Sequence, residues 1–453
     1  MGRPKHTDWH GRWIGAKKEV SSPLLRKQFS IKKQVAKARA YVSGVGWSEL
    51  YLNGEKAGDR VLDPACTDYH KSVMYVTHDV TDLLFKGENG VGIMLGNGWF
   101  CEPGWKMNYG DTPQAILLLR VTCEDGNIDL VSTDADWRVS SGPIIQNDIY
   151  KGEKYDARRE KEGWTEPGYD DSGWAAALVK DRPRGVLKSQ IMPPIRVNQN
   201  LKPIRETEPK PGVFMFEFDQ LFGGWVRIRA KGPAGTQIAI KYSARIDEKT
   251  GLLDTKRHRL GEPADLYIMK ADTDGEQYEP RFTYHSVRYV QIEGYPGKAA
   301  IEDIDGRVIY SDMDLSREFS YSNPVLNKIH LMVKWTMTNG LFGMPLDCLY
   351  REHWAWTDPA AIAGNPYPRK HIPSFWLKWL ADIRESQFEN GGIPDVAPNY
   401  VLSAHEDGAW GGNYPVLVWY LYQYFDDPGI PEEHFETAKN RWNISQRCLK
   451  TGS

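Results

Sequence analysis

The residues best suited to chemistry lie in one short stretch, MPLDCLYREHWAWTDPA, at positions 344–360. It sets the carboxylates of Asp347 and Glu352 and the guanidinium of Arg351 among tryptophans and a tyrosine, with Asp358 near its end. Such charged groups are seldom fully buried without partners, so the stretch is atypical of a core. Aromatic faces beside acids and an arginine could instead bind a sugar ring and its hydroxyls. The alternative is an exposed turn with a surface ion pair between Arg351 and Glu352.

The composition limits the possible function classes. A chain of 453 residues is long enough for about two to four domains, each with a buried core. Its 57 basic and 60 acidic residues give a net charge of −3, without a long run of either sign. This balance predicts no nucleic-acid partner and no membrane partner. Seventeen tryptophans are spread along the chain, which weakly favours a protein that handles carbohydrate.

The cysteines and the N-terminus indicate redox state and compartment. The five cysteines are far apart and never form a Cys-x-x-Cys pair, so neither a disulfide framework nor a zinc site is expected. The N-terminal stretch MGRPKHTDWHGRWIGA has no apolar core, so no signal peptide is expected, and no apolar run is long enough for a membrane helix. As written, the chain is expected to be cytoplasmic; a start further upstream would allow a periplasmic or secreted protein.

The first part of the chain has the turn signals of β structure. Residues 34–59 alternate apolar and polar side chains up to Asn53-Gly54, a pair typical of a tight hairpin turn. Further strand-like runs follow, with Asp125-Gly126 as another turn. Short strands separated by glycine-rich turns predict a β-sandwich or jelly roll over residues 1–200.

Two stretches interrupt this pattern. Residues 148–174 are rich in charge and glycine and predict a long loop with short helical pieces. Residues 188–212 carry several prolines, as a connection between domains would. Strand-like runs resume at Val213, with GPAG and TDG as hairpin turns, and predict a second β-sandwich over residues 201–314.

Near residue 315 the hydrophobic period becomes that of helices. Residues 324–342 place apolar side chains four apart, and residues 374–392 form a second helical stripe that ends at two glycines. Residues 414–427 are apolar nearly all round, which predicts a helix buried between others. The part from residue 315 to 453 is therefore expected to be helical, with the acidic stretch in the loop between its first two long helices.

This order of segments resembles glycoside hydrolase family 78, the α-L-rhamnosidases. LDPACTDYHKSVMYVTHDVTDLLFKGENGVGIMLGNGWF resembles the family's N-terminal β domain, and FEFDQLFGGWVRIRAKGPAGTQIAIKYSARID resembles its second β domain. DCLYREHWAWTD resembles the loop that opens the catalytic (α/α)₆ barrel, and GAWGGNYPVLVWYLYQYF resembles a later barrel segment. The resemblance implies a multidomain β + α fold, in which two β-sandwich or jelly-roll domains precede the first part of an (α/α)₆ barrel.

The resemblance also implies a role for each residue of the acidic stretch. In this family the Glu of the loop is the general acid, which points to Glu352. Burial among Trp354 and Trp356 would keep such a carboxyl protonated near neutral pH. The residues implied to bind rhamnose by hydrogen bonds or stacking are Asp347, Arg351, Trp356, Asp358 and Trp410. The implied reaction is an inverting release of terminal α-L-rhamnose by an acid, a base and water, with no cofactor and no metal.

Two positions depart from the family's pattern. Leu349 stands where the family usually has a proline, and His353 is unusual. His353 could tune the acidity of Glu352, while a neutral histidine packed among aromatic rings is the simpler interpretation.

The general base is harder to find. Twelve helices with their connections need about 200 residues, but from Asn323 onward only about 130 remain. In the family the base lies far downstream of the acidic loop, so the missing half of the barrel or a second chain could supply it. Within this chain the candidates are Asp395, Glu406 and Asp407.

Two other functions stay open on these residues. The chain could be a non-catalytic carbohydrate-binding protein with a decayed half barrel. It could also be a sugar lyase built on an (α/α) barrel, for which Tyr350 and His353 would offer the required pair of side chains. The partner expected in the leading interpretation is a rhamnose-containing oligosaccharide or glycoside.

Overall fold

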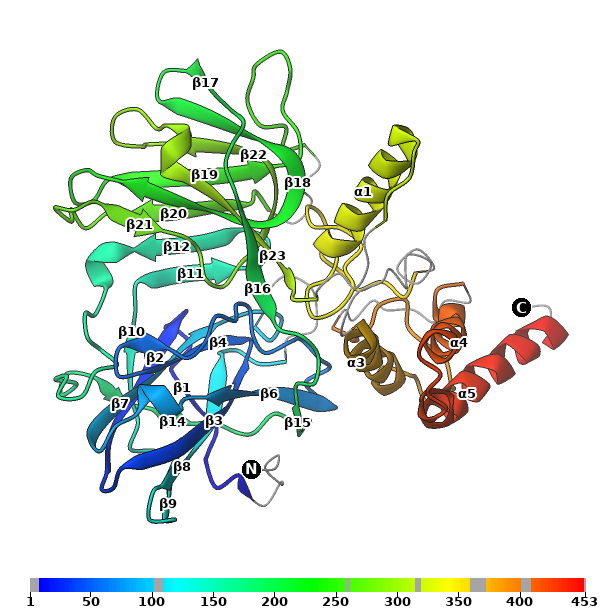
Figure 1. Cartoon of the computed structure of the whole chain (residues 1–453), viewed down its shortest axis with the longest axis horizontal. Coiled ribbons are helices and arrows are strands. Elements are labelled where there is room, and N and C mark those ends of the chain that lie inside the picture. Colours follow the sequence, from blue (N-terminus) through cyan, green and yellow to red (C-terminus); the bar gives the residue numbers. More distant parts are fainter. Residues whose placement is uncertain are drawn as a thin grey trace.

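A computed structural model describes residues 8–101, 109–256, 258, 261–313, 319–358, 372–400 and 409–451. Two β units lie one above the other, and the helices α1, α3, α4 and α5 lie to one side of them (Figure 1). This is the predicted order of two β-rich parts followed by a helical part. Among the described residues, no helix has the length and hydropathy needed to cross a bilayer.

The N-terminal unit is a sandwich of two sheets. One sheet has the strand order β14-β1-β8-β3-β6-β15, with β9 paired to β8, and the other has the order β13-β10-β2-β7-β4-β5. The strands of the first are β1 (Ile14–Gly15), β3 (Val35–Val45), β6 (Ser72–Asp79), β8 (Gln114–Cys123), β9 (Ile128–Ser132), β14 (Leu178–Val179) and β15 (Val186–Ser189). Those of the second are β2 (Pro23–Ile31), β4 (Trp47–Leu52), β5 (Glu55–Lys56), β7 (Gly87–Gly96), β10 (Arg138–Ser141) and β13 (Ala175–Ala176).

The core of this sandwich comes from the facing sides of its sheets. Val42 and Leu117 from one sheet and Leu25 and Ile93 from the other belong to one buried cluster. The predicted turn at Asn53-Gly54 connects β4 to β5, and both residues have positive φ, as a tight hairpin turn requires. The short helix η2 (Thr81–Leu83) follows β6.

The second unit is one large sheet of ten strands. Its order is β11-β12-β20-β19-β22-β18-β23-β16, with β17 and β21 paired to β18. The strands are β11 (Ile144–Asp148), β12 (Gly152–Asp156), β16 (Ile195–Leu201), β17 (Arg205–Lys210), β18 (Val213–Ala230), β19 (Gln237–Ser243), β20 (Ala264–Ile268), β21 (Glu276–Tyr278), β22 (His285–Glu293) and β23 (Ile304–Ser311). The short helices η3 (Ala157–Arg159) and η4 (Ile301–Asp303) precede or follow strands of this sheet.

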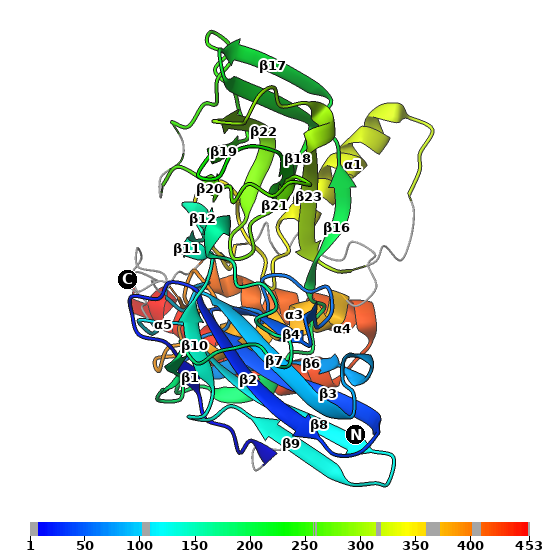
Figure 2. The same ribbon diagram turned by 90° about the vertical axis from the view of Figure 1, so that its left-hand side faces the viewer.

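Two stretches expected to be irregular form strands of this second sheet. The interpretation of residues 148–174 as a loop is wrong at its start, because β11 and β12 form a hairpin whose second strand pairs in parallel with β20. Both views place this hairpin at the boundary between the β units (Figures 1 and 2). The expected connection at residues 188–212 instead contains β16 and β17; Pro194 and Pro203 lie outside the strands, and Pro209 lies where the pairing of β17 with β18 is irregular. The predicted N-terminal domain, residues 1–200, includes two segments that belong to the second sheet. They are residues 144–156 and residues 195–201.

The helical part consists of α1 (Pro324–Asn339), α3 (Ile372–Glu385), the short η5 (Gly411–Asn413), α4 (Tyr414–Phe425) and α5 (Gly429–Thr451). Asn323 caps α1, because its side chain accepts a hydrogen bond from the Val325 amide. The stripe predicted for α3 is confirmed, since Trp376, Trp379 and Leu380 are at most 1% exposed.

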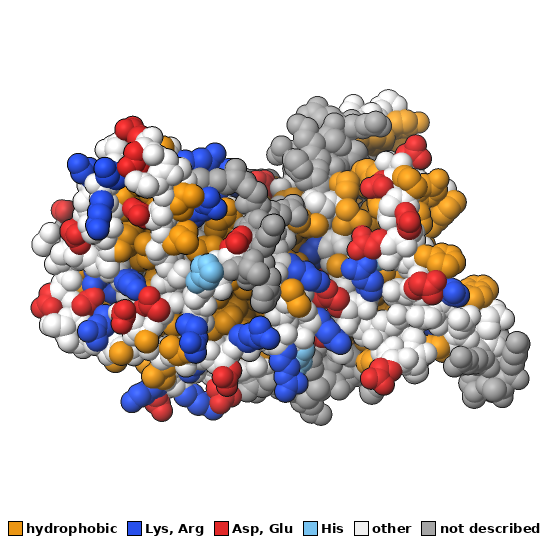
Figure 3. All heavy atoms as spheres, turned by 90° about the horizontal axis from the view of Figure 1, so that it is seen from below, with side chains coloured by type: hydrophobic (Ala, Val, Ile, Leu, Met, Phe, Trp, Pro, Cys, Tyr) orange, Lys and Arg blue, Asp and Glu red, His pale blue; other side chains and the backbone are white. Residues whose placement is uncertain are grey.

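The prediction that residues 414–427 form a helix buried between others is wrong for one side of that helix. Trp419 and Tyr424 of α4 are more than half exposed, because the described helices α3 and α5 contact only part of its surface. On α1, Val325 and Ile329 of the predicted stripe are also exposed. Hydrophobic side chains gather on the helical side of the molecule (Figure 3). The helical part thus presents apolar surface that a stable core would normally cover.

One further core joins all three parts of the chain. It contains Trp47 of the sandwich, Phe282 and Tyr284 beside the second sheet, Phe342 after α1 and Trp376 of α3. The acidic stretch begins at the edge of this shared core, so packing from every part of the fold determines its position.

Candidate active site

The acidic stretch forms a closed loop after α1. The amide of Asp347 donates to the carbonyl of Trp354 over 2.9 Å, and the amide of Trp354 donates to the Asp347 carboxylate over 3.1 Å. At its start, the loop is anchored by a 2.7 Å hydrogen bond from the amide of Ser311, at the end of β23, to the carbonyl of Leu341. Two hydrogen bonds across the ends of residues 347–354 hold this short segment in a defined shape.

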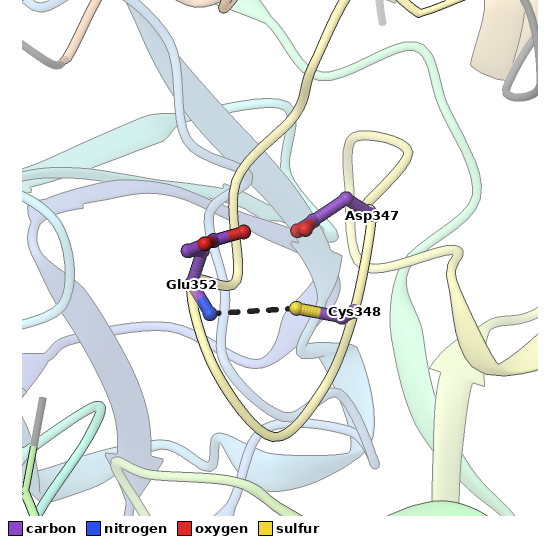
Figure 4. Close-up of side chains that lie close together, drawn as sticks. All are labelled: Asp347, Cys348 and Glu352. Atoms are coloured by element: carbon purple, nitrogen blue, oxygen red, sulfur yellow. Dashed lines mark hydrogen bonds between the residues drawn. The ribbon is translucent and has the colours of Figure 1, made fainter. Parts of the chain in front are cut away.

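Inside this loop, the carboxyl groups of Asp347 and Glu352 face each other (Figure 4). Desolvation by the loop, and then a hydrogen bond with the Glu352 carboxyl, raise the pKa of Asp347 to about 6. The Asp347 carboxyl is therefore partly protonated near neutral pH, because a like charge so close opposes its ionisation. The loop therefore holds an acidic proton in the pH range where a general acid works.

Cys348 lies beside the two carboxyl groups. One ligand atom from each of these three residues lies within 4.8 Å of the others, which is close enough to share a metal ion. However, burial raises the pKa of the Cys348 thiol, and Arg351 already neutralises Glu352. A protonated thiol is a poor metal ligand, and a carboxylate already paired with an arginine is a weaker one, so this set of donors does not fit a metal ion.

The ion pair between Arg351 and Glu352 is present. Arg351 Nε lies 2.9 Å from Glu352 Oε1, and Arg351 Nη2 donates to Glu352 Oε2 over 3.1 Å. The Arg351 side chain is 38% exposed, and exposed pairs of this kind contribute at most about 1 kcal/mol. The guanidinium can therefore turn from Glu352 to a ligand hydroxyl at little energetic cost.

His353 has the simpler of its two expected roles. It is buried between the rings of Tyr150 and Tyr284, at centroid distances of 5.2 and 4.7 Å. Burial lowers the pKa of His353 to about 3, so the ring is neutral at physiological pH. In the neutral ring, Nε2 donates to the carbonyl of Leu349 over 3.0 Å. The imidazole bonds the backbone of its own loop, and its pairing with Tyr350 for lyase chemistry gains no support from this geometry.

The aromatic side of the loop continues toward the later helices. The Trp354 and Trp356 rings lie 5.5 Å apart, and Trp356 forms a β-bridge with Val396. Thr357 donates to the carbonyl of Asp395 over 2.7 Å, while Asn413 donates to the carbonyls of Thr357 and Trp410.

This network connects the backbone next to Trp356 and Asp358 with Trp410. Trp410 is thus linked to the loop through Asn413, although it lies more than fifty positions after Trp356 and Asp358 in the sequence. Their roles toward a sugar remain predictions.

The three acids considered as the general base have different positions relative to the loop. Asp395 lies beside Thr357, whereas Glu406 and Asp407 lie outside the described residues. Asp347 does not fit the role, because its carboxyl is within 4.8 Å of the Glu352 carboxyl. An inverting acid and base stand about 6.5 to 9.5 Å apart to admit a water molecule.

Several contacts to the loop were not predictable from the local sequence. The Tyr150 hydroxyl donates to the Glu352 carbonyl over 2.8 Å, and the Tyr400 hydroxyl accepts from the Ala355 amide over 2.8 Å. Beneath the loop lies a cavity of about 20 Å³, between loop residues such as Arg351 and His285 of β22. The second β unit therefore directly supports the underside of the loop.

The fold is that of a multidomain protein in which two β units support a helical part with an acidic and aromatic loop, and the family models identify the class as glycoside hydrolase. Three family models match the chain in the same order. They are an α-L-rhamnosidase N-terminal domain at residues 33–199, a bacterial α-L-rhamnosidase concanavalin-like domain at 207–310 and a bacterial α-L-rhamnosidase six-hairpin glycosidase domain at 315–448. The chain belongs to the α-L-rhamnosidase family, glycoside hydrolase family 78, which confirms the resemblance found in the sequence.

Individual relatives agree with this assignment. A curated α-L-rhamnosidase from Streptomyces avermitilis is 35% identical over 411 residues, which are 89% of this chain and 40% of that protein. The structure of α-L-rhamnosidase from Dictyoglumus thermophilum has a TM-score of 0.93 at 38% identity, covering 98% of this chain and 52% of the other. Streptomyces avermitilis α-L-rhamnosidase complexed with L-rhamnose has a TM-score of 0.89 at 33% identity, covering 95% and 42%. The chain spans 40–51% of the length of the curated relatives it matches.

Proposed function

We propose that this chain carries the acid and the rhamnose-recognition residues of an inverting α-L-rhamnosidase. The observation that supports this most is the loop that brings the carboxyl groups of Asp347 and Glu352 within 4.8 Å of each other and also carries the neighbouring rings of Trp354 and Trp356. The substrate would be a glycan or glycoside that ends in α-L-rhamnose. The L-rhamnose complex of the Streptomyces avermitilis relative supports this choice of sugar.

In the proposed reaction, Glu352 donates its proton to the glycosidic oxygen as the bond from that oxygen to the anomeric carbon breaks. A water molecule attacks the same carbon from the opposite face and gives a proton to the base. The products are rhamnose of inverted configuration and the free alcohol. Arg351 and Asp347 would bind the sugar hydroxyls, and Trp356, Asp358 and Trp410 would stack on or hydrogen-bond the ring.

The base is proposed to come from residues outside this sequence, in a longer polypeptide or a second chain. Two observations support this. Asp347 is too close to Glu352 to leave room for the attacking water. In addition, α1 and α4 expose apolar faces that further helices would cover. A non-catalytic carbohydrate-binding protein is not favoured, because the curated relatives are α-L-rhamnosidases.

Hydrolysis of methyl α-L-rhamnoside, whose poor leaving group needs protonation, by the 453-residue chain tests the acid and the base together. Glu352→Gln is the test variant, and Glu160→Gln, on the exposed surface of the second β unit, is the matched control. Calorimetric binding of L-rhamnose is measured on the same samples. Rhamnose binding without hydrolysis is the expected result for the chain alone. Hydrolysis that Glu352→Gln abolishes would place the base within this chain, and absence of both binding and hydrolysis would contradict the proposed function.

A further inference from the structure

Glu352 is held by a tyrosine far away in the sequence. Tyr150 lies in the turn between β11 and β12, and its hydroxyl donates to the backbone carbonyl of Glu352 over 2.8 Å. The Tyr150 side chain is 7% exposed, so this hydrogen bond is largely shielded from water. This hydrogen bond fixes the backbone of Glu352, and the position of the backbone limits the positions that the Glu352 carboxyl can reach.

The residue after Glu352 is held from the same side. His353 has a left-handed backbone with φ of 57°, a conformation that few residues other than glycine adopt, although histidine adopts it more often than most. Its Nε2 bonds the carbonyl of Leu349, four residues earlier, and thereby closes the turn that contains Arg351 and Glu352. A strained residue persists only where its surroundings hold it, and such residues concentrate at functional sites.

A continuous stack of buried rings provides these surroundings. Tyr150 packs on His353, His353 stacks on Tyr284 and Tyr284 stacks on Phe342, with the last two centroids 4.6 Å apart. All four side chains are less than 9% exposed. The stack joins the β11–β12 hairpin, the start of β22 and both ends of the acidic turn. The second β unit therefore bears directly on the backbone of Glu352.

We propose that Tyr150 and His353 are positioning residues, which fix the backbone of Glu352 so that its carboxyl meets the glycosidic oxygen. This inference rests on the proposed function for its catalytic part. Its structural part stands alone, because the hydrogen bonds and the ring stack restrain the turn whether or not a substrate is present. The β11–β12 hairpin is then a support of the active site and not only an edge of the second sheet.

The first experiment measures how firmly the backbone around Glu352 is held, and it needs no catalytic reaction. Hydrogen exchange of the peptide covering residues 347–356 is compared between the unaltered chain and Tyr150→Phe, which keeps the ring but lacks the hydroxyl. Loss of a hydrogen bond worth about 1 kcal/mol should accelerate this exchange about fivefold. Tyr155→Phe is the control, because the Tyr155 hydroxyl, in the adjacent strand, bonds Glu160 and not the loop. Exchange that stays unchanged in Tyr150→Phe would overturn the inference.

The second experiment tests whether the restraint serves the acid. A glycoside with a poor leaving group needs protonation, whereas p-nitrophenolate leaves with little help. In a protein that turns over both substrates, Tyr150→Phe and His353→Phe should lower kcat for methyl α-L-rhamnoside at least tenfold more than for p-nitrophenyl α-L-rhamnoside. Equal losses would show a merely structural role and overturn the positioning inference. If the unaltered chain turns over neither substrate, the exchange experiment still decides the structural part, and only the proposed function loses support.

Discussion

The carboxyl groups of Asp347 and Glu352 face each other within 4.8 Å across one turn of backbone, which the Asp347–Trp354 hydrogen bonds close. A charge on one carboxyl group so close opposes ionisation of the other. Desolvation by burial, and then the neighbouring Glu352 carboxyl, raise the pKa of Asp347 to about 6. The pH dependence of any activity should follow this pair and not either residue alone.

Replacing Asp347 by Asn should move the alkaline limb of activity to lower pH. The neutral amide no longer opposes ionisation of the neighbouring carboxyl, so the acidic proton is lost earlier as the pH rises. The measurement is kcat/KM against pH for methyl α-L-rhamnoside, whose leaving group needs the acid, in a form of the protein that hydrolyses it. Asp136→Asn, on the exposed surface of the sandwich, should leave the limb near pH 6. An unmoved limb in Asp347→Asn would show that the two carboxyl groups titrate independently.

Replacing His353 by Asn should destabilise the protein more at neutral pH than at acidic pH. Asn tolerates the left-handed backbone of this position. Burial lowers the pKa of His353 to about 3, against about 6.5 in the unfolded chain, so the unfolded state binds more protons between these values. The stabilisation by the neutral ring is complete above pH 6.5 and is lost as the pH falls.

The loss of unfolding free energy caused by His353→Asn should therefore shrink by up to about 1.4 kcal/mol for each pH unit below 6.5. Urea unfolding at pH 7.5, 6.5 and 5.5 measures the unfolding free energy of the variant and of the unaltered chain, and the difference between the two is compared across the pH values. The comparison uses this difference because burial raises the pKa of other carboxyl groups, such as Glu153, and these groups make both proteins more stable as the pH falls. A constant difference across the three pH values would contradict the prediction, and the exposed His10→Asn provides the reference.

The exposed faces of α1 and α4 should make the chain self-associate. Met332 of α1 is 68% exposed and Trp419 of α4 is 53% exposed, each among other exposed apolar side chains. We expect sedimentation velocity to show association between about 1 and 100 μM, which Met332→Lys with Trp419→Lys reduces without lowering the Tm. Leu130→Lys, at a similarly exposed position in β9, is the control and should change nothing. A monomer at all concentrations would show that these faces do not drive association.

The local parts of this architecture could be predicted from the sequence. The apolar stripe of α3 and the Asn53-Gly54 turn each depend on neighbouring residues, so their patterns were readable. The acidic stretch was recognisable because Asp347, Arg351 and Glu352 lie within six positions. Their ordered motif also carried the family resemblance that the comparisons confirm.

The support of the site could not be predicted in the same way. Tyr150 lies 202 positions from Glu352, and no local pattern connects the two. The hairpin that carries Tyr150 was read as a loop, because its charge and glycine content outweighed its short strand pattern. It is stable as an edge of the second sheet, through pairing with β20, which begins more than a hundred positions later. Long-range pairing of this kind overrides local propensity.

The buried ion pair of Lys378 and Asp382 should stabilise the junction between α3 and the N-terminal sandwich. Their charged atoms lie 2.7 Å apart, and Lys378 Nζ also donates to the carbonyls of Cys66 and Gly343. Lys378→Met would leave the Asp382 carboxyl buried without its cation, at a cost of about 3 kcal/mol. Burial already raises the pKa of Asp382 to about 7, so the loss of stability should be larger at pH 8, where the unpaired carboxyl is more often charged, than at pH 6.

Urea unfolding followed by tryptophan fluorescence measures this loss of stability, and the double variant Lys378→Met with Asp382→Leu should recover much of it. A double variant no more stable than Lys378→Met would show that the carbonyl contacts of the lysine, and not the ion pair, hold the junction.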